Sequence, residues 1–112
     1  MPATPTLLIA PKQAENAQTT QYTSPAAGKG TLLDKFTATN TSASSVTLSI
    51  NLVSDGTPSD NDLVIKARSI AAGATETFPE LVGSFLPAGA IISTIASAGT
   101  ALTIRANGRE LT

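Results

Sequence analysis

The segment SVTLSINLV, residues 45–53, carries the cleanest hydrophobic pattern in the chain. Its apolar residues Val46, Leu48, Ile50 and Leu52 alternate with the polar residues between them. Successive side chains of a β-strand point to opposite faces, so this period of two predicts a strand with one buried and one exposed face. The β-branched residues in the segment favour the same structure, because they fit the pleated surface of a sheet.

Similar but weaker patterns lie on both sides of this segment. Residues 31–39, 63–68, 75–81, 90–97 and 100–108 predict further strands, and turn residues separate them. No window shows a helical stripe, and a chain of 112 residues fits one domain. We therefore expect an all-β fold, a single antiparallel β-sandwich of the jelly-roll or immunoglobulin-like type. Asn107-Gly108 is a turn signal and predicts a bend that ends the last strand.

The first 29 residues differ from the rest. They carry four prolines and only three charged residues, and they lack sustained alternation. We expect residues 1–29 to form an extended N-terminal arm, with one strand at Thr6–Ala10, and residues 30–112 to form the sandwich domain. Ordering a free segment costs roughly 1–2 kcal/mol per residue in backbone entropy. The arm should therefore become ordered only against a neighbouring molecule or against its own domain.

The arm contains the residues that we expect to contact a partner. Leu7, Leu8 and Ile9 form its apolar run, and Tyr22 is the only tyrosine of the chain. An arm of this kind can add a strand to a neighbour's sheet, with alternate side chains held in pockets. Buried aliphatic and aromatic side chains commonly dominate the binding energy of such contacts. The run is too short to span a membrane, and with no basic residue before it we expect no secretory leader.

The loop SDGTPSDND, residues 54–62, is the part of the chain that most resembles a chemical site. Its aspartates Asp55, Asp60 and Asp62 are possible calcium ligands in a loose sandwich-loop site. A helix-loop-helix calcium loop starting at Asp55 fails, because Lys66 occupies the position that requires glutamate. The alternative is a simple connection, since Asp-Gly and Pro-Ser-Asp-Asn are turn formers that bond their own backbone. It would join a strand that ends at Val53 to the next one, and neutralising the aspartates would then change folding little.

The composition argues against several classes of function. The chain has no histidine and no cysteine, so it lacks the commonest general base, the commonest transition-metal ligand and any thiol nucleophile. No phosphate-binding glycine loop occurs, and the carboxylate pairs at residues 60/62 and 76/80 lack an aromatic sugar platform. The net charge of −1 gives no basic field for nucleic acid. We expect a protein that is not an enzyme, has no cofactor or metal, and binds neither nucleic acid nor membrane.

Four basic residues fall on outward-facing strand positions: Lys66, Arg68, Arg105 and Arg109. In residues 63–68 the alternation places Leu63, Ile65 and Ala67 on the opposite face. If the two strands involved are neighbours, these cations form one small positive patch. Such a patch would either keep the surface solvated or contact an acidic partner.

Four segments form a shared pattern: KQAENAQTTQYTS, LLDKFTATNTSASSVTLSINLV, LVIKARSIAAGATETFPELVG and GAIISTIASAGTALTIRANGRELT. Together they resemble small virion proteins of tailed bacteriophages. The matching pieces are Leu33–Ser42, Val46–Val53, Ser69–Thr75 and Gly89–Ala96, within residues 12–112. The acidic residue that usually follows the late glycine is Ala90 here. The resemblance implies a structural part of the particle and transfers no catalytic residue.

The resemblance leads to a first hypothesis and to two alternatives. The first is a capsid decoration or cement protein that binds the major capsid protein on the outer surface of the phage head. It would form a homo-oligomer, a dimer or trimer, and assemble in the host cytoplasm. A structural protein of the neck, the tail or a fibre base is the first alternative. A carbohydrate- or calcium-binding adhesin module is the second.

Overall fold

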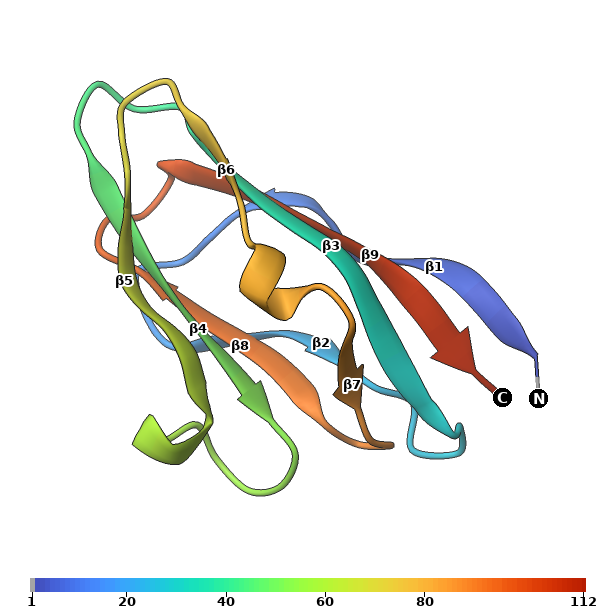
Figure 1. Ribbon diagram of the computed structural model, residues 1–112. Coiled ribbons are helices and arrows are strands. Elements are labelled where there is room, and N and C mark those ends of the chain that lie inside the picture. Colours follow the sequence, from blue (N-terminus) through green and yellow to red (C-terminus); the bar gives the residue numbers. More distant parts are fainter. Residues whose placement is uncertain (1) are drawn as a thin grey trace.

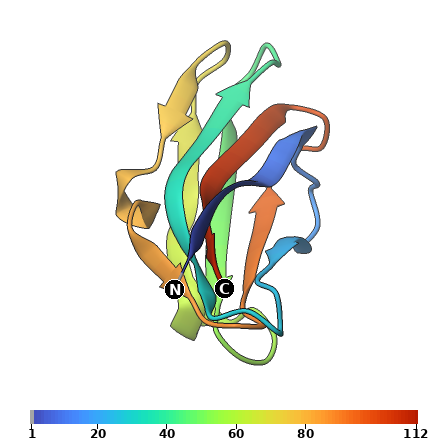
Figure 2. The same cartoon turned by 90° about the vertical axis from the view of Figure 1, so that its right-hand side faces the viewer.

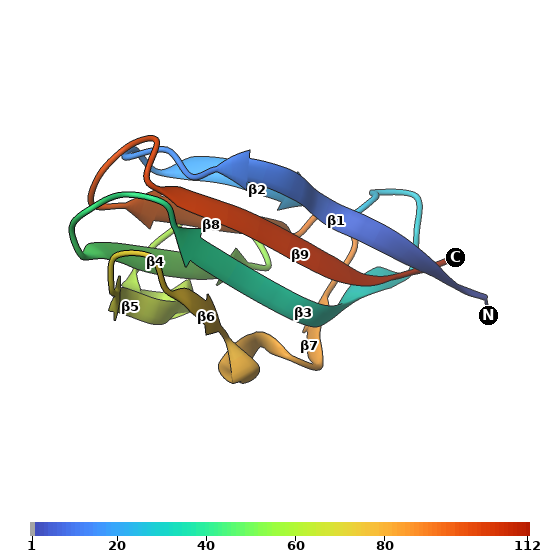
Figure 3. The ribbon, with the colours of Figure 1, turned by 90° about the horizontal axis from the view of Figure 1, so that it is seen from above.

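Two antiparallel sheets packed face to face form the computed structural model, which describes residues 2–112 (Figure 1). Sheet A contains, in spatial order, β1 (Ala3–Gln13), β9 (Leu102–Leu111), β3 (Gly30–Asn40) and β6 (Thr75–Thr77), and β7 (Ser84–Leu86) also pairs with β3. Sheet B contains β2 (Thr19–Thr23), β8 (Ile91–Ala96), β4 (Val46–Val53) and β5 (Leu63–Ile70). Figures 2 and 3 show the two layers from the end and from above. The predicted all-β antiparallel sandwich is confirmed.

Strand β4 is the segment with the cleanest alternation, and it lies inside sheet B between β8 and β5. Leu48 and Ile50 are fully buried, and Leu52 packs against the same core. The structure adds a feature that the alternation did not predict. Asn51 and Val53 face away from this core but are also buried, with 4% and 1% of their surface exposed. The loop that follows β4 therefore folds back over the outer face of sheet B.

The N-terminal segment is not an extended arm in this structure. Strand β1 pairs along its length with β9 in sheet A, and β2 pairs with β8 in sheet B. Residues 3–23 thus contribute one strand to each sheet, and Pro2 accepts a backbone hydrogen bond from Thr112 at 3.1 Å, so the chain ends lie side by side (Figure 2). Burial of Leu8 and Ile9 in the core is the physical reason, because it offsets the entropy of ordering the segment. The segment is ordered against its own domain.

The core lies between the sheets and is mostly aliphatic. Its aromatic centre is a pair, Phe36 of β3 and Phe78, whose ring centroids are 5.2 Å apart and whose planes meet at 84°. Phe78 precedes the 3-10 helix η2 (Pro79–Leu81), so the chain leaves the ladder after β6 near the proline. Proline cannot donate a ladder hydrogen bond, so the strand expected over residues 75–81 ends before Pro79.

Strand β5 departs from the predicted alternation. Between the pairs Leu48–Arg68 and Ile50–Ile65, β5 contains one residue more than β4. The extra residue is Ala67, which has φ of +47° and lies on the exposed side instead of beside Ile65. This β-bulge turns Arg68 back toward the core edge, where its guanidinium lies 5.1 Å from the centre of the Phe78 ring. The predicted placement of Ala67 with Ile65, and of Arg68 with Lys66, is therefore wrong.

Candidate functional site

The acidic loop between β4 and β5 is a closed turn. Its end forms the 3-10 helix η1 (Asp60–Asp62), and Ser59 caps the helix by accepting a hydrogen bond from the Asn61 amide at 3.3 Å. Asp62 returns the contact, because its Oδ1 accepts from the Ser59 amide at 3.1 Å and from Asn51 Nδ2 at 2.7 Å. Asn51 Nδ2 also donates to the Ser59 carbonyl at 3.0 Å. The loop is thereby tied to the outer face of sheet B.

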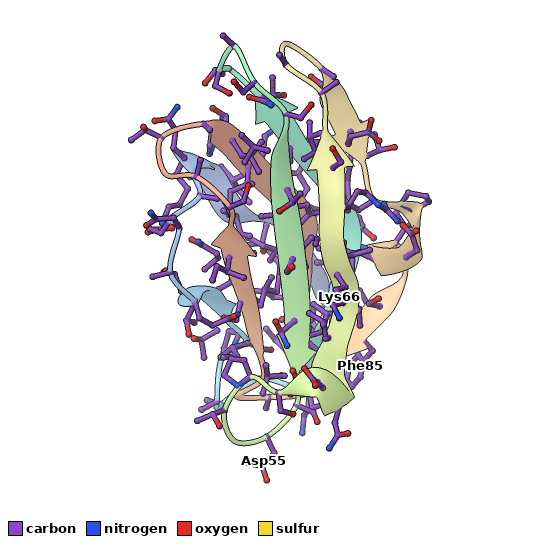
Figure 4. The ribbon with its side chains drawn as sticks, turned by 90° about the vertical axis from the view of Figure 1, so that its left-hand side faces the viewer. Asp55, Lys66 and Phe85 are labelled. Atoms are coloured by element: carbon purple, nitrogen blue, oxygen red, sulfur yellow. The ribbon has the colours of Figure 1, made fainter. Side chains whose placement is uncertain are left out.

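The other two aspartates of the loop are exposed. Asp55 lies at the tip and points away from the molecule, while Asp60 lies at the start of η1 (Figure 4). Within residues 2–112, no three acidic, histidine or cysteine side chains are grouped so that they could hold a metal ion. The calcium site considered as an alternative for this loop is therefore not assembled, and the connection between two strands is what the structure shows.

Asp62 is the loop aspartate on which folding depends. We expect Asp62→Ala to lower the free energy of unfolding by about 1–2 kcal/mol, because it removes the acceptor of the Ser59 amide and one of the two acceptors of Asn51 Nδ2. Asp55→Ala, the matched control, should change it by less than about 0.5 kcal/mol. Urea unfolding measures both. If the two variants have the same free energy of unfolding, Asp62 does not cap the helix. If Asp62→Ala has the larger effect, the expectation that neutralising these aspartates changes folding little is wrong for Asp62.

A pocket of about 300 Å³ lies between the acidic loop and sheet B. Its polar wall includes the Asp60 carboxylate, the Lys66 ammonium and the Gln18 amide, and its apolar wall includes Pro58 and Ile95. Figure 4 shows Lys66 on this face, on β5. Gln18 Nε2 is held there by Ser93 Oγ at 2.7 Å and by Asn51 Oδ1 at 3.3 Å. The pocket can hold a small polar molecule.

Tyr22 links the two sheets at one end of the sandwich through its hydroxyl group. Its hydroxyl donates to Glu110 Oε2 at 2.6 Å and lies 2.8 Å from Thr31 Oγ1, which in turn lies 2.8 Å from the buried Ser24 hydroxyl. Burial and the adjacent Glu110 carboxylate raise the pKa of Tyr22 from 10.0 to about 12. The side chain that we expected to contact a partner is therefore used mainly to join β2 of sheet B to β3 and β9 of sheet A.

Because the chain has one tyrosine, its ionisation can be followed directly by near-ultraviolet absorbance. We expect a midpoint near pH 12 in the folded protein, and a midpoint closer to 10 in denaturant. The folded state then holds the proton more tightly, so this contribution to stability is complete below pH 10 and is lost as pH rises toward 12. Glu110→Gln should lower the midpoint in the folded protein. A native midpoint near 10 would contradict the network.

The remaining residues that we expected in the arm lie in β1. Leu8 and Ile9 have 7% and 2% of their surface exposed and belong to the protein's own core. They are therefore not available to a partner, and this part of the prediction is corrected. Leu7 points the other way and is 48% exposed. Its register partner on β9 is Asn107, which places both on the outer face of sheet A.

The four cations do not form one patch, because their strands belong to different sheets. On β5, Arg68 forms a salt bridge with Glu80, and this contact lowers the pKa of the Glu80 carboxyl. On β9, Arg109 binds Asp34 through two hydrogen bonds, Nε–Oδ2 at 3.0 Å and Nη2–Oδ1 at 2.9 Å. Among the described residues, Lys66 and Arg105 form no ion pair, and they lie on opposite faces of the sandwich.

The outer face of sheet A is the second candidate site. Strand register places Leu7 of β1, Asn107 of β9 and Lys35 of β3 in one row across this face. Arg105 is the next outward residue along β9. These residues line a groove of about 590 Å³, here called the sheet A groove. Toward one end of the face, Phe85 of β7 lies opposite Leu32 and is 51% exposed.

Sequence reasoning missed two residues of this groove, Lys35 and Asn107. Among the described residues, Lys35 and Arg105 make no ion pair or side-chain hydrogen bond. The Oδ1 atom of Asn107 is buried and has no hydrogen-bond donor. In the sequence, Lys35 is one polar residue of the strand expected over residues 31–39, and Asn107 was assigned to a bend. Their proximity depends on the β3–β9 register, which is not visible in the sequence.

Comparison of the chain with protein-family models, with curated proteins and with solved structures found no match. Within residues 2–112 there is also no helix that is long and apolar enough to cross a membrane. The functional interpretation therefore depends on the surfaces described above.

Proposed function

We propose that this chain is a non-enzymatic structural protein of a tailed-bacteriophage particle. In this proposal it is a capsid decoration, or cement, protein that binds the major capsid protein and stabilises its lattice on the outer surface of the head. The observation that carries the proposal is the outer face of sheet A. It exposes the large apolar side chain of Leu7 near Lys35 and Arg105, which have no ion-pair partner among the described residues, and it carries the exposed Phe85 toward one end.

Two further features support a protein-binding role. Within residues 2–112, three of the four large apolar side chains that are highly exposed belong to sheet A or to the segment leading into β7: Leu7, Val82 and Phe85. Apolar groups gathered beside polar ones are typical of sites where proteins associate. The likeness of the strand pattern to small virion proteins points to the same class of partner.

The structure changes how such a protein would bind. An arm that adds its strand to a neighbour is not available, because β1 is already paired with β9. Contact through the sheet A face replaces it. Assembly in the host cytoplasm and self-association as a dimer or trimer remain part of the proposal, since closed symmetric oligomers are the common state of such proteins.

Co-sedimentation with undecorated capsids tests the proposal. The purified chain is expected to pellet with the capsids at saturation and to raise their resistance to heat. Absence from the pellet, together with absence from purified particles by mass spectrometry, would sink the proposal. Copy number separates it from a neck, tail or fibre-base role, because a decoration protein follows the number of capsid subunits whereas a neck or tail part is present in far fewer copies.

A small-ligand adhesin module is a second candidate, and the pocket beneath the acidic loop is the observation that favours it. Asp60, Lys66 and Gln18 supply the groups that bind hydroxyls or a zwitterion. Calorimetry with a glycan panel, with and without calcium, tests this function. Saturable heat that disappears in Lys66→Ala would support it, and absence of heat throughout would remove it.

A further inference from the structure

The sheet A groove has an excess of positive charge within it. Asp34 is a carboxylate on its rim, and Arg109 already neutralises it through two hydrogen bonds. Lys35 and Arg105 remain without a partner among the described residues. Both are exposed and both point outward from adjacent strands of one sheet.

The two cations are close enough to bind one anionic group. Lys35 lies opposite Asn107, and Arg105 is two residues along β9 from Asn107, a separation of about 7 Å. Diagonal neighbours on one face of an antiparallel pair are within reach of each other when their side chains are long. A carboxylate seated above this diagonal can therefore accept from the lysine ammonium and the arginine guanidinium together.

Asn107 lies in the same row as Leu7 and Lys35 and lines the groove between them. Its Oδ1 atom is buried, so a ligand in the groove does not reach that atom. The polar requirement on the ligand is therefore the anionic group for the two cations. On the β1 side, Leu7 and Pro5 offer an apolar contact to the same ligand.

An extended acidic segment of protein meets both conditions. An Asp or Glu side chain supplies the carboxylate, and the alternation of an extended chain presents an apolar residue nearby. We infer that the sheet A groove binds an extended acidic segment of a partner protein, with the carboxylate on Lys35 and Arg105 and an apolar side chain on Leu7. The inference rests on the proposed function where it assigns this segment to the capsid surface.

A labelled peptide tests the groove without capsids. The probe is a fluorescein-labelled decapeptide of alternating Asp and Val, and fluorescence anisotropy measures its binding at low and at physiological salt. Saturable binding that weakens with salt is expected for the wild-type protein. The double substitution Lys35→Glu/Arg105→Glu should weaken it at least tenfold.

The matched control is Lys12→Glu/Lys29→Glu, which changes the net charge by the same amount at two exposed lysines outside the groove. It should bind the peptide within about twofold of the wild type if electrostatics act locally. Thermal unfolding confirms that every variant folds. Equal losses in both double variants, or no binding by the wild-type protein, would overturn the inference. Preferential binding of heparin over the peptide at Lys35 and Arg105 would also overturn it, in favour of a sulfated glycan.

The peptide and capsid experiments can fail independently. If the peptide binds as expected but the protein does not pellet with capsids, the proposed function fails and the groove inference stands for another partner. If the protein pellets with capsids and Lys35→Glu/Arg105→Glu pellets equally well, the groove inference fails and the decoration role stands.

Discussion

Gly108→Ala is expected to destabilise the protein by at least about 3 kcal/mol, toward the upper end of what overpacking causes. Gly108 lies in the interior of β9, opposite Thr6 of β1 and Leu33 of β3. A Cβ atom at this position would overlap the carbonyl oxygen of Leu32 and would lie 2.6 Å from Leu8 Cδ1. The first of these atoms is backbone within the sheet, so it cannot move without breaking the pairing of β3 with β9.

Gly99→Ala is the matched control for this substitution. A Cβ atom there would have its nearest contact at 3.8 Å, with Asn16 Cγ, and the backbone needs no positive φ. It should therefore leave stability unchanged or raise it slightly, because alanine restricts the unfolded chain. Guanidinium unfolding of both variants gives the comparison. Similar midpoints for the two would show that β3 and β9 are not as closely spaced at Gly108 as the structure has them.

Gly108 also shows where sequence patterns mislead. Asn-Gly commonly marks a turn, and it predicted that the last strand bends at Asn107. Strand β9 instead continues from Leu102 to Leu111. The glycine is needed for close approach of a neighbouring strand next to a register shift between Leu33 and Lys35. Crowding by a strand far away in the sequence leaves no local signal.

The strands that alternation predicted well are those that contain no extra residue themselves, because at each of their register shifts the extra residue lies on the partner strand β1, β3 or β5. In β9, Leu102, Ile104 and Ala106 are buried as expected, and β4 places Leu48 and Ile50 inward. Strand β1 was recognised only in part, because two register shifts interrupt its pairing with β9. The first shift buries Leu8 and Ile9 consecutively, which removes the period of two. From its sequence, this segment was therefore predicted to be an arm, although in the structure it is the edge strand of sheet A and pairs with β9.

The candidate site was less predictable than the fold. Outward basic residues were visible in the sequence, yet their grouping depends on strand order. Arg105 lies near Lys35 because β9 pairs with β3, whereas Arg68 and Lys66 lie in the other sheet. Asn40 gives a further example, since it directly follows the strand expected over residues 31–39 and has no apolar side chain to predict its burial. It is fully buried, donates to the Ser44 and Ile70 carbonyls at 2.8 and 2.9 Å, and accepts from the Ser42 amide.

Phe36→Ala is expected to lower the free energy of unfolding by about 3–5 kcal/mol. Phe36 is fully buried and meets Phe78 edge to face, so truncation removes both a large apolar surface and a specific aromatic contact. A domain of this size commonly has only about 5–15 kcal/mol of stability, so the variant should be partly unfolded at physiological temperature. Urea unfolding followed by circular dichroism measures the change.

Two controls separate burial from the aromatic contact. Phe85→Ala removes the same side chain where it is 51% exposed, and it should cost less than about 1 kcal/mol. A double-mutant cycle of Phe36→Leu with Phe78→Leu should give a coupling of about 0.5–1.5 kcal/mol for the edge-to-face pair. Equal losses in Phe36→Ala and Phe85→Ala would be incompatible with a core centred on Phe36. A coupling energy of zero would show that the edge-to-face contact does not stabilise the protein, while leaving the burial of Phe36 as the source of its effect.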